Sequence, residues 1–337
     1  MQSLYPLLIN PEYVERVWGT KNLGPFYDQA VSGAPIGEVW LTGDRCTVRN
    51  GALAGKTLQA LAKQYGEAFL GAAATNVSRF PLLLKVLYPK EKLSVQVHPD
   101  DAMASTCGED CGKTECWYVL CAEPGAQVAI GLKPGVSSAD VKQAIQENRL
   151  EALLNWLTVS PGELLYIEAG TIHAIAPGSI LLETQQNSDT TYRLYDYGRP
   201  RELHIDKGLE AFKPQACAGK IAPAHRNEHK NLIDSPCFVV NHYTISKRVA
   251  LHTVPSDGNS SVHCIFMSEG SGTLEVPGAE MIELQRGDAA LVPACIGEYA
   301  IRASGVAGME FLCAHLPAIE TEHPHARATL HEQALHS

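Results

Sequence analysis

The residues that could do chemistry begin with a short segment in which polar and apolar side chains alternate. The segment reads Leu93-Ser-Val-Gln-Val-His-Pro, and in a β-strand Ser94, Gln96 and His98 would share one face while two valines shared the other. A face directed to solvent would be expected to carry Lys, Glu or Thr, whereas Gln and His directed inward suit metal ligands. The segment alone therefore leaves two interpretations open, a metal site and an exposed strand face.

Two later segments supply further potential ligands. Glu115 opens the apolar run Cys116-Trp-Tyr-Val-Leu, where an unpaired carboxylate would be costly unless a positive group faces it. His173 follows a strand and a glycine turn, Leu164-Leu-Tyr-Ile-Glu-Ala-Gly. Two imidazoles, one carboxylate and one amide oxygen suit a redox-inert divalent ion such as zinc, with one position open for substrate. The expected ligands are Gln96, His98, Glu115 and His173.

The elements that must position these residues are mostly β-strands. The chain contains 28 Gly and 20 Pro, and the apolar runs between these turn residues are short, which predicts a mainly β architecture. Two segments instead have apolar residues at helical spacing: residues 57–70, after a Thr cap, and residues 138–157, with a break near Asn148. We interpret both as helical insertions in the N-terminal half of a β scaffold.

The second half of the chain suggests another β unit. Residues 205–236 are polar and rich in His, as expected of a linker, and His225 and His229 fit a solvated connection better than a metal site. Residues 237–315 return to short strands with glycine turns, and residues 319–337 are polar and expected to be loose. For a chain of 337 residues we expect two domains, residues 1–235 and 236–337.

Composition and charge narrow the function classes. The formal net charge is -10 at pH 7, which argues against nucleic acid or an anionic membrane as partner, although Lys and Arg gathered in one cleft could bind a small anion. The N-terminus does not resemble a signal peptide, and no stretch approaches the roughly 20 apolar residues of a membrane span. The ten cysteines form no Cys-x-x-Cys pair, which predicts reduced thiols and a cytoplasmic setting.

The motifs also resemble those of a known family. A strand with His, a Glu opening the next strand and a Gly-x-x-His turn resemble the two cupin motifs, and their surroundings are similar to type I mannose-6-phosphate isomerases of the compact bacterial branch. The similar stretches run in the family's order from about residue 7 to residue 205. They are Val17-Trp-Gly, Ile36-Gly-Glu-Val-Trp, Pro81-Leu-Leu-Leu-Lys-Val-Leu, Leu93-Ser-Val-Gln-Val-His-Pro-Asp, Gly112-Lys-Thr-Glu, Ala169-Gly-Thr-Ile-His-Ala-Ile and Glu183-Thr-Gln-Gln-Asn-Ser-Asp-Thr-Thr-Tyr-Arg-Leu-Tyr-Asp-Tyr-Gly-Arg.

The resemblance implies a fold and a set of roles. The fold would be two cupin-type β-barrels, or jelly rolls, and the four expected ligands would hold one Zn²⁺ per chain. Arg193 matches the arginine assigned to catalysis, and Arg199 matches a basic position near the pocket mouth where phosphate is expected. The positions that match the family's substrate pocket are Lys85, Ser94, Lys113 and Glu183. One departure is Glu168, which stands where the motif usually has Pro.

The second barrel is expected to lack a metal. His173 follows Gly162 by eleven residues, whereas the residue at the same distance from Gly287 is Glu298. We therefore expect the second barrel to be a degenerate cupin with a supporting role.

The activity implied by the resemblance is the interconversion of mannose 6-phosphate and fructose 6-phosphate through a cis-enediol. Lys113 and Glu183 are both candidates for the base that moves the proton between C1 and C2. Arg193 stays protonated, so its fork suits stabilisation of the enediolate or binding of phosphate. The expected partner is a small sugar phosphate, and the expected state is a monomer or weak homodimer.

Other functions remain open at this point. A cupin can be an iron oxygenase, but such sites usually have three His and one Glu, and Gln96 weakens that interpretation. A non-catalytic sugar-binding cupin would need no Lys113 and Arg193 beside the metal, and these two could be ordinary salt-bridge partners. An isomerase of another sugar or sugar phosphate would share all of the motifs.

Overall fold

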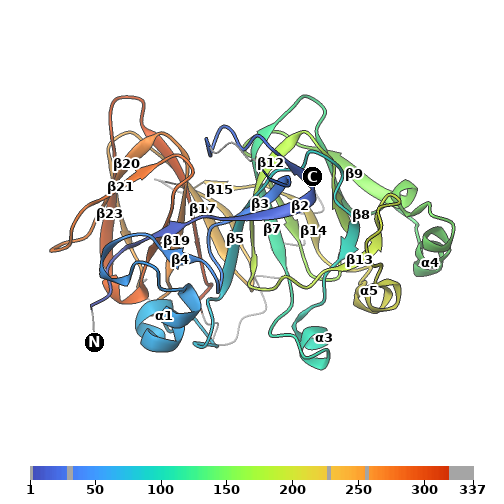
Figure 1. Cartoon of the computed structure of the whole chain (residues 1–337), viewed down its shortest axis with the longest axis horizontal. Coiled ribbons are helices and arrows are strands. Elements are labelled where there is room, and N and C mark those ends of the chain that lie inside the picture. The colour runs from blue at the N-terminus through green and yellow to red at the C-terminus, as the bar shows by residue number, and fades with distance from the viewer. Residues whose placement is uncertain (1–2, 29–32, 226–228, 255–257, 319–337) are drawn as a thin grey trace.

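The computed structural model describes residues 3–28, 33–225, 229–254 and 258–318, and the strands of these residues form four antiparallel sheets (Figure 1). The mainly β architecture is therefore confirmed. Strands of the N-terminal part make a seven-stranded and a five-stranded sheet, and strands of the C-terminal part make most of an eight-stranded and a four-stranded sheet. The polar tail, residues 319–337, lies outside the described residues.

The spatial order of the strands in each sheet differs from their order along the chain. The seven-stranded sheet is β14 (Ala218–Ile221), β10 (Leu164–Ile167), β7 (Glu115–Ala122), β12 (Ser179–Gln186), β5 (Leu82–Leu87), β3 (Ile36–Trp40) and β2 (Glu12–Thr20). The five-stranded sheet is β13 (Tyr192–Tyr195), β6 (Val95–Val97), β11 (His173–Ile175), β8 (Gln127–Leu132) and β9 (Leu154–Thr158). The eight-stranded sheet is β15 (Ala224–His225), β16 (His229–Asp234), β17 (Val239–Ile245), β24 (Met309–His315), β19 (His263–Glu269), β22 (Ala289–Val292), β1 (Leu7–Asn10) and β4 (Thr47–Val48). The four-stranded sheet is β18 (Arg248–His252), β23 (Glu298–Ala303), β20 (Ser271–Glu275) and β21 (Ile282–Gln285).

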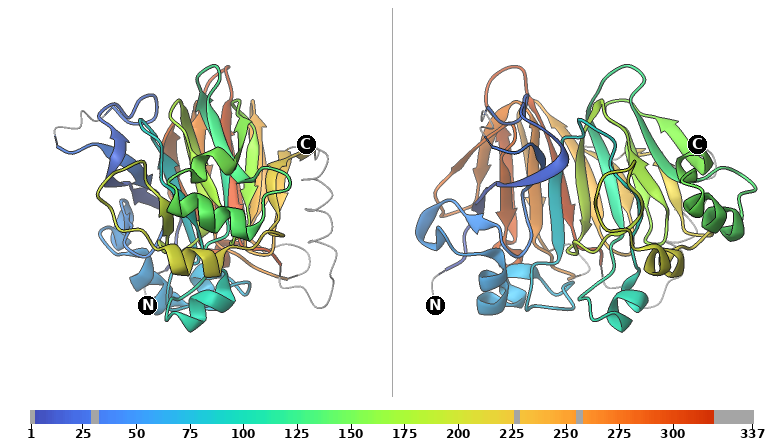
Figure 2. Two further views of the ribbon diagram at one scale, coloured as in Figure 1. Left: turned by 90° about the vertical axis from the view of Figure 1, so that its right-hand side faces the viewer. Right: turned by 45° about the vertical axis from the view of Figure 1, so that its right-hand side comes forward.

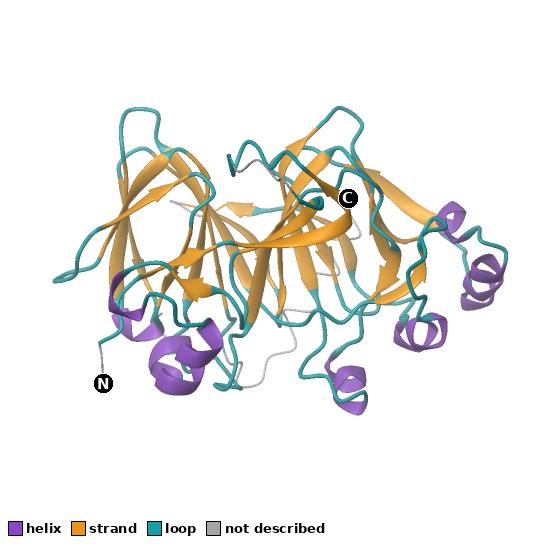
Figure 3. Ribbon diagram, in the orientation of Figure 1, coloured by secondary structure: helices purple, strands orange, loops and turns teal. Residues whose placement is uncertain are grey.

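The helices lie at the periphery of the sheets (Figure 3). They are α1 (Leu58–Tyr65), α2 (Glu67–Leu70), α3 (Asp101–Thr106), α4 (Ser138–Gln146) and α5 (Ile205–Ala211), with 3₁₀ turns at Gly51–Leu53, Leu150–Leu153 and Ala294–Ile296. Figure 2 shows α4 and α5 in front of the strands of the N-terminal part. There Val141 and Ala211 pack with Val95 and Val97 of β6, so the apolar face of that strand is covered by helices.

The seven- and eight-stranded sheets pack against each other through alternate side chains of their strands. In β7, Cys116 and Tyr118 belong to a core shared by the seven- and eight-stranded sheets. The residues between them on the strand, such as Trp117, face the five-stranded sheet instead. Because successive residues of a strand point to opposite faces, one strand serves two cores. Glu115 and Glu183 lie on the second of these faces, because Glu115 is two residues from Trp117 on β7 and Glu183 of β12 is directly opposite Trp117.

The N-terminal strands cross the expected domain division. Leu7 of β1 pairs with Leu291 of β22, and Ile9 of β1 pairs with Val48 of β4. The eight-stranded sheet therefore contains residues from both ends of the described chain. The division at residue 235 stays a prediction.

The two predicted helical insertions are confirmed in their first parts. Residues 57–70 form α1 and α2, and the Thr57 side chain accepts a hydrogen bond from the Ala60 backbone N–H, as a cap should. Residues 138–146 form α4, and the chain breaks at Asn148, whose φ is 53°. The prediction was wrong for residues 154–157, which belong to β9, because pairing with β8 outweighs the helical spacing of their leucines.

The predicted linker is partly regular structure, and that prediction was wrong for most of the segment. Residues 205–211 form α5, β14 adds an edge strand beside β10, and β16 pairs with β17. Short elements of this kind carry few apolar residues, so a polar composition concealed them. In the described part of the chain, no helix is long and apolar enough to cross a membrane. All ten cysteines are described, and each is a free thiol.

Candidate metal centre and active site

Three buried side chains with metal-binding atoms meet between the seven- and five-stranded sheets. Within the described residues, His98, Glu115 and His173 form the group of three potential ligands, with ligand atoms within 4.8 Å of one another. The two imidazole Nε2 atoms lie 3.5 and 3.4 Å from the two oxygens of Glu115. Glu115 opens β7, as predicted, and His173 opens β11 after the glycine turn. His98 was expected within a strand with Ser94 and Gln96, but β6 covers only Val95–Val97 and His98 directly follows it.

Hydrogen bonds fix both imidazoles with the same nitrogen toward Glu115. His98 Nδ1 lies 2.9 Å from the carbonyl oxygen of Thr190, and His173 Nδ1 lies 2.9 Å from that of Thr171. Because a carbonyl only accepts hydrogen bonds, Nδ1 carries the proton in each ring and Nε2 presents its lone pair. This arrangement is typical of metal-ligating histidines.

The Glu115 carboxylate is the feature that requires a cation. Its side chain is 0% exposed, and among the described residues neither oxygen accepts a hydrogen bond of normal geometry. The one cationic side chain at short range is Lys113, whose Nζ lies 3.2 Å from Oε2. Burial raises the pKa of Glu115 to about 8, against the lowering effect of Lys113. An uncompensated buried carboxylate of this kind fits a divalent cation.

Burial also keeps the two imidazoles uncharged. It lowers the pKa of His98 well below its usual range, and Lys113 adds to this effect. For His173, burial lowers the pKa to about 4. Neutral imidazole is the form that binds a metal.

Gln96, the fourth predicted ligand, lies beside this group with its amide nitrogen toward His173 and its amide oxygen toward Ser94. Its Nε2 lies 3.2 Å from His173 Nε2, and its Oε1 accepts a hydrogen bond of 3.1 Å from Ser94 Oγ. In the paired strands β6 and β11, Gln96 is directly opposite His173. The structure therefore brings all four predicted ligands together.

A cavity of about 310 Å³ opens beside these ligands. Gln96 and Lys113 are among its lining residues, and half of the other lining residues are charged. The lining residues are Arg16, Trp18, Glu38, Lys85, Leu87, Leu93, Ser94, Gln96, Lys113, Trp117, Ile175, Glu183, Asp189, Thr191, Arg193 and Arg201. Four arginine or lysine side chains besides Lys113 reach this space, so it can attract a small anion despite the net negative charge of the chain.

Lys85 and Glu183 form a buried ion pair in the cavity wall. Lys85 Nζ lies 2.8 Å from Glu183 Oε2, and Trp117 Nε1 donates a hydrogen bond of 3.1 Å to the other oxygen. Burial alone would raise the pKa of Glu183, but Lys85 and Lys113 lower it to about 2. Burial alone would lower the pKa of Lys85, but Glu183 and Glu38 raise it above its usual value. Both groups are therefore charged at neutral pH.

The three arginines at residues 193–201 differ in their partners. Arg193 lines the cavity, donates through Nη1 to the Glu202 carbonyl at 2.8 Å, and has a buried Nε without a hydrogen-bonding partner. Arg201 also lines the cavity and binds both oxygens of Asp196 at 2.6 Å. Arg199 is not among the lining residues, because its guanidinium binds Asp196 and the Lys92 carbonyl, at 2.8 and 2.7 Å.

Comparison with known proteins agrees with this geometry. A sequence model described as the catalytic domain of type I phosphomannose isomerase matches residues 7–118. The chain is 34% identical over 330 residues to the probable mannose-6-phosphate isomerase GmuF of Bacillus subtilis, an alignment covering 92% of this chain and 99% of the relative. The mannose-6-phosphate isomerase of Streptococcus mutans is 33% identical over 302 residues, covering 86% of this chain and 92% of the relative. The chain belongs to the type I phosphomannose isomerase family.

A solved structure extends the likeness to three dimensions. The crystal structure of mannose 6-phosphate isomerase from Bacillus subtilis matches this chain with a TM-score of 0.82 at 31% sequence identity. The match covers 92% of this chain and 99% of the other. The family membership of this chain therefore holds along almost its whole length.

Some residues that line the cavity of this phosphomannose isomerase family member were not predicted from the sequence. Glu38 accepts hydrogen bonds of 3.0 Å from Arg16 and one of 2.7 Å from Trp40 Nε1. These residues lie in the stretches Val17-Trp-Gly and Ile36-Gly-Glu-Val-Trp or next to them, which carried the resemblance without an assigned role. A charged residue inside an otherwise buried strand such as β3 was the available signal. No such signal marked Arg201, because Arg199 stands two residues before it and the sequence does not distinguish the two arginines.

Proposed function

We propose that this chain interconverts mannose 6-phosphate and fructose 6-phosphate by moving a proton between C1 and C2 through a cis-enediol. The observation that carries the proposal is the buried, unsatisfied Glu115 between two oriented imidazoles, next to Lys113 and a cavity that Lys113 lines with four other Lys and Arg side chains. A divalent cation there would attract the sugar oxygens, and the arginines would attract the phosphate. Family membership supports the same substrate.

We propose Zn²⁺, one per chain, as the cation held by Gln96, His98, Glu115 and His173. Two nitrogen ligands, one carboxylate and one amide oxygen are a donor set that zinc accepts while leaving a position for substrate. When bound, the ion supplies Lewis-acid stabilisation of negative charge on the sugar oxygens. All four ligands come from the seven- and five-stranded sheets or from residues directly after their strands.

We propose Lys113 as the group that moves the proton. Its Nζ lies 3.1 Å from His98 Nε2 and lines the cavity. Glu183 is the weaker candidate, because its pKa of about 2 makes it a poor base at neutral pH. Its role is instead to hold Lys85 in the cavity wall.

We propose separate roles for the arginines and a binding role for Ser94. The backbone of Arg193 pairs with that of Gln96, so its guanidinium reaches the cavity beside the metal ligands and can stabilise the enediolate. Arg201 lines the same cavity and is placed to receive the phosphate, which we assign to it in preference to Arg199. Ser94 orients Gln96 through its hydroxyl and reaches the substrate space.

The finer architecture is also a proposal. We infer that the seven- and five-stranded sheets are one cupin-type barrel and the eight- and four-stranded sheets a second, degenerate one without a metal. We also infer a cytoplasmic enzyme that works as a monomer or weak homodimer. The free thiols and the family support this setting.

The experiment that tests the function is a coupled assay on mannose 6-phosphate beside unphosphorylated mannose. The phosphate should contribute to turnover as well as capture, because binding energy from a remote group can position the reacting carbons. We expect free mannose to lose both kcat and affinity. Equal kcat on the two sugars at saturation would move the assignment to a free-sugar isomerase, and activity on neither would remove the proposal.

A further inference from the structure

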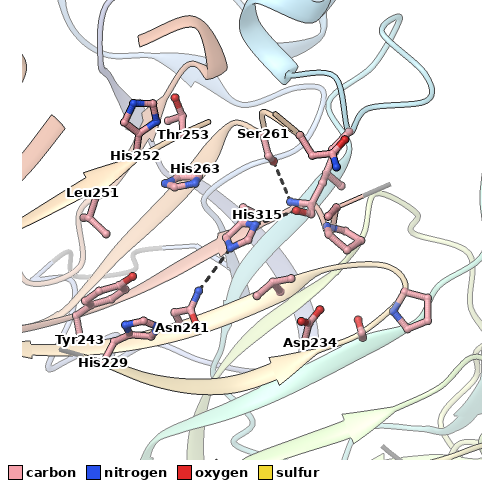
Figure 4. A pocket seen from close by; sticks show the side chains of 18 of the residues that line it. His229, Asp234, Asn241, Tyr243, Leu251, His252, Thr253, Ser261, His263 and His315 are labelled. Atoms are coloured by element: carbon pink, nitrogen blue, oxygen red, sulfur yellow. Dashed lines mark hydrogen bonds between the residues drawn. The ribbon is translucent and has the colours of Figure 1, made fainter. Parts of the chain in front are cut away.

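A second and larger cavity lies away from the active site. Its volume is about 810 Å³, and it opens between β17, β18, β19 and β24 of the C-terminal part (Figure 4). His252, His263 and His315 lie near one another in this cavity, with Asn241 close to His315. A volume in the range of small-molecule sites, with several polar groups converging on it, is typical of a binding pocket.

Strand pairing gives this cavity the same topological place as the active site. Glu115 is the first residue of β7, which lies between β10 and β12. His263 is the first residue of β19, which lies between β22 and β24 in the same way. His263 therefore occupies the position in the C-terminal sheets that Glu115 occupies in the N-terminal sheets.

The paired strands beside it repeat the second half of the active site. In the active site, His173 opens β11 and is directly opposite Gln96 of β6. In the C-terminal part, Glu298 opens β23 and is directly opposite His252 of β18. Glu298 is exposed and is not among the residues that line the cavity, whereas His252 is among them.

Hydrogen bonds occupy Nδ1 in each of the three rings. His315 donates from Nδ1 to the Leu316 carbonyl at 2.8 Å, and its Nε2 lies 3.5 Å from Asn241 Nδ2. His263 uses Nδ1 with the Tyr299 hydroxyl at 2.7 Å. His252 accepts from the Val254 N–H at Nδ1, at 3.0 Å. In His263 and His252 these bonds use Nδ1 and leave Nε2 to meet a ligand, whereas His315 Nε2 is already within reach of the Asn241 amide.

This cavity and the active site differ in the charge of the side chains that line them. No Lys or Arg is among its described lining residues, whereas Arg16, Arg193 and Arg201 line the active site. Burial lowers the pKa of His263 and of His315, so these rings are neutral at pH 7. The described lining therefore offers no cationic side chain that would select a phosphate.

A metal ion is also a poor fit for this cavity. Among the described residues, the group with three ligand atoms within 4.8 Å is the one at Glu115, and the cavity histidines are not part of it. His252 accepts a hydrogen bond at Nδ1, so its Nε2 carries the proton and has no lone pair for a metal.

We propose that this cavity is a second binding site, for a neutral hydroxylated ligand of the mono- or disaccharide class. Imidazole and amide groups both donate and accept hydrogen bonds, as sugar hydroxyls do. Val249 and Leu251 line the cavity and offer apolar contact for the C–H faces of a sugar ring. The proposal does not depend on the isomerase assignment, since none of these residues lines the active site.

The test is equilibrium dialysis of the full chain against labelled D-glucose and labelled maltose. We expect saturable binding. Its affinity should fall at least tenfold in Leu251→Trp, which fills the cavity. It should fall as much in His252→Ala, which removes a polar contact at an exposed and tolerant position. Glu298→Gln is the matched control, since it changes the residue opposite His252 but outside the cavity, and it should bind as the wild type does. Arg193→Lys serves as the active-site control and should also retain the binding.

The phosphorylated sugar gives a second contrast. The binding that Leu251→Trp removes should be at least tenfold weaker for glucose 6-phosphate than for glucose, because the described lining residues include no Lys or Arg. The proposal is overturned by the absence of saturable binding of both neutral sugars, or by binding that neither cavity variant weakens. A second tightly held Zn²⁺ that is lost in His263→Gln would also overturn it, by showing that the histidines form a metal site.

Discussion

At the residue scale, the Glu115 carboxylate is costly to bury, because among the described residues neither of its oxygens accepts a hydrogen bond of normal geometry. It is fully buried, its ligand partners are neutral imidazoles, and Lys113 is the one cation that compensates it at short range. Without a bound cation this group destabilises the folded chain, and with one it becomes a ligand. The same atoms therefore link stability to metal content.

Glu115→Gln should separate these two effects. We expect the affinity for Zn²⁺ to fall by more than about 100-fold. Removing only a hydrogen-bonding partner of a metal ligand already lowers metal affinity by about 10- to 100-fold, and Glu115 is itself a proposed ligand. At pH 7 the metal-free variant should melt near the temperature of the metal-free wild type or above it. A pKa of about 8 leaves the folded Glu115 carboxyl mostly uncharged, as the amide is, but the carboxyl must take up a proton on folding and the amide need not. Metal titration and thermal melts of both metal-free proteins measure this. A metal-free variant that melts well below wild type would contradict the destabilising role of Glu115.

Arg193→Lys should affect turnover and leave the fold intact. Lysine keeps the charge but loses the two-pronged geometry, so the loss should appear in kcat and amount to about 2–4 kcal/mol, as for one oxyanion donor. Zinc content and melting temperature should stay near wild type. Measuring zinc, melting temperature and kcat on one preparation distinguishes this from a structural role, which would lower stability and leave kcat per zinc-loaded site normal.

The buried pair of Lys85 and Glu183 predicts a pH dependence of stability. The pKa of Glu183 is about 2 in the folded chain against an ordinary value of 4.5. Between these values the unfolded chain binds a proton that the folded chain does not, so the pair stabilises the fold above about pH 4.5 and this contribution is lost as pH falls toward 2. Denaturant unfolding of metal-free wild type and Glu183→Gln should give free energies that converge on acidification. Parallel curves would show that the pair contributes nothing.

Individual site residues could be predicted where a local sequence pattern identifies them. Gln96, His98, Glu115 and His173 follow from alternation, burial and a glycine turn, and the structure brings them together. Arg201 could not be chosen over Arg199, because both stand in one loop and both bind Asp196, and only the further hydrogen bond of Arg199 to the Lys92 carbonyl distinguishes them. Such choices depend on three-dimensional partners and not on spacing.

At the scale of elements, the glycines around α2 differ in what surrounds them. Gly66 and Gly71 both have positive φ, at 54° and 95°. A Cβ on Gly66 would meet no atom within 4 Å, whereas one on Gly71 would lie 2.1 Å from the Ser260 carbonyl oxygen. Gly71 marks a close contact between the end of α2 and the segment that leads into β19.

A pair of alanine variants should separate conformation from contact at these glycines. Gly66→Ala should lose about 1–3 kcal/mol of unfolding free energy through backbone strain alone. Gly71→Ala should lose a further 1–3 kcal/mol or so, because the backbone must also move away from Ser260. Denaturant unfolding of the two variants measures the difference. Equal losses would mean that the contact at Ser260 is not tight.

Helices were predicted where the apolar periodicity extends over several turns and begins with a capping residue, as in α1 and α4. Residues 154–157 continued a helical spacing but form β9, because the free edge of β8 offers strand pairing that a local pattern cannot reveal. Helix α3 was missed because its six residues are too few to show a period, although Asp100 caps it through a hydrogen bond to the Met103 N–H. Short elements are specified by tertiary partners.

At the scale of the whole molecule, one core joins the N-terminal and C-terminal parts. It lies between the seven- and eight-stranded sheets and includes Leu7 of β1, Leu84 of β5 and Leu312 of β24. All four Trp residues precede residue 157, so Trp fluorescence reports on the N-terminal part and circular dichroism on both parts. The two probes can therefore detect whether the parts unfold together.

Leu7→Ala should destabilise both parts at once. Leu7 is fully buried in the shared core, and its truncation should cost about 2–5 kcal/mol. We expect the fluorescence and circular dichroism transitions to stay coincident and to move together to lower denaturant. A conservative change on the surface, Lys63→Arg on α1, should leave both transitions in place. Transitions that separate in Leu7→Ala would support two independent domains instead.

The pairing of β1 with β22 has a consequence for the chain as it is being made. Leu7 leaves the ribosome early, but its partner Leu291 is added more than two hundred residues later. At about 5–20 residues per second, β1 waits for its neighbour for on the order of tens of seconds. During that interval an apolar strand edge lies unpaired in the nascent chain, which is a site for chaperone capture and for association between neighbouring chains on one messenger. The last strands to be synthesised thus close a sheet that the first strand began.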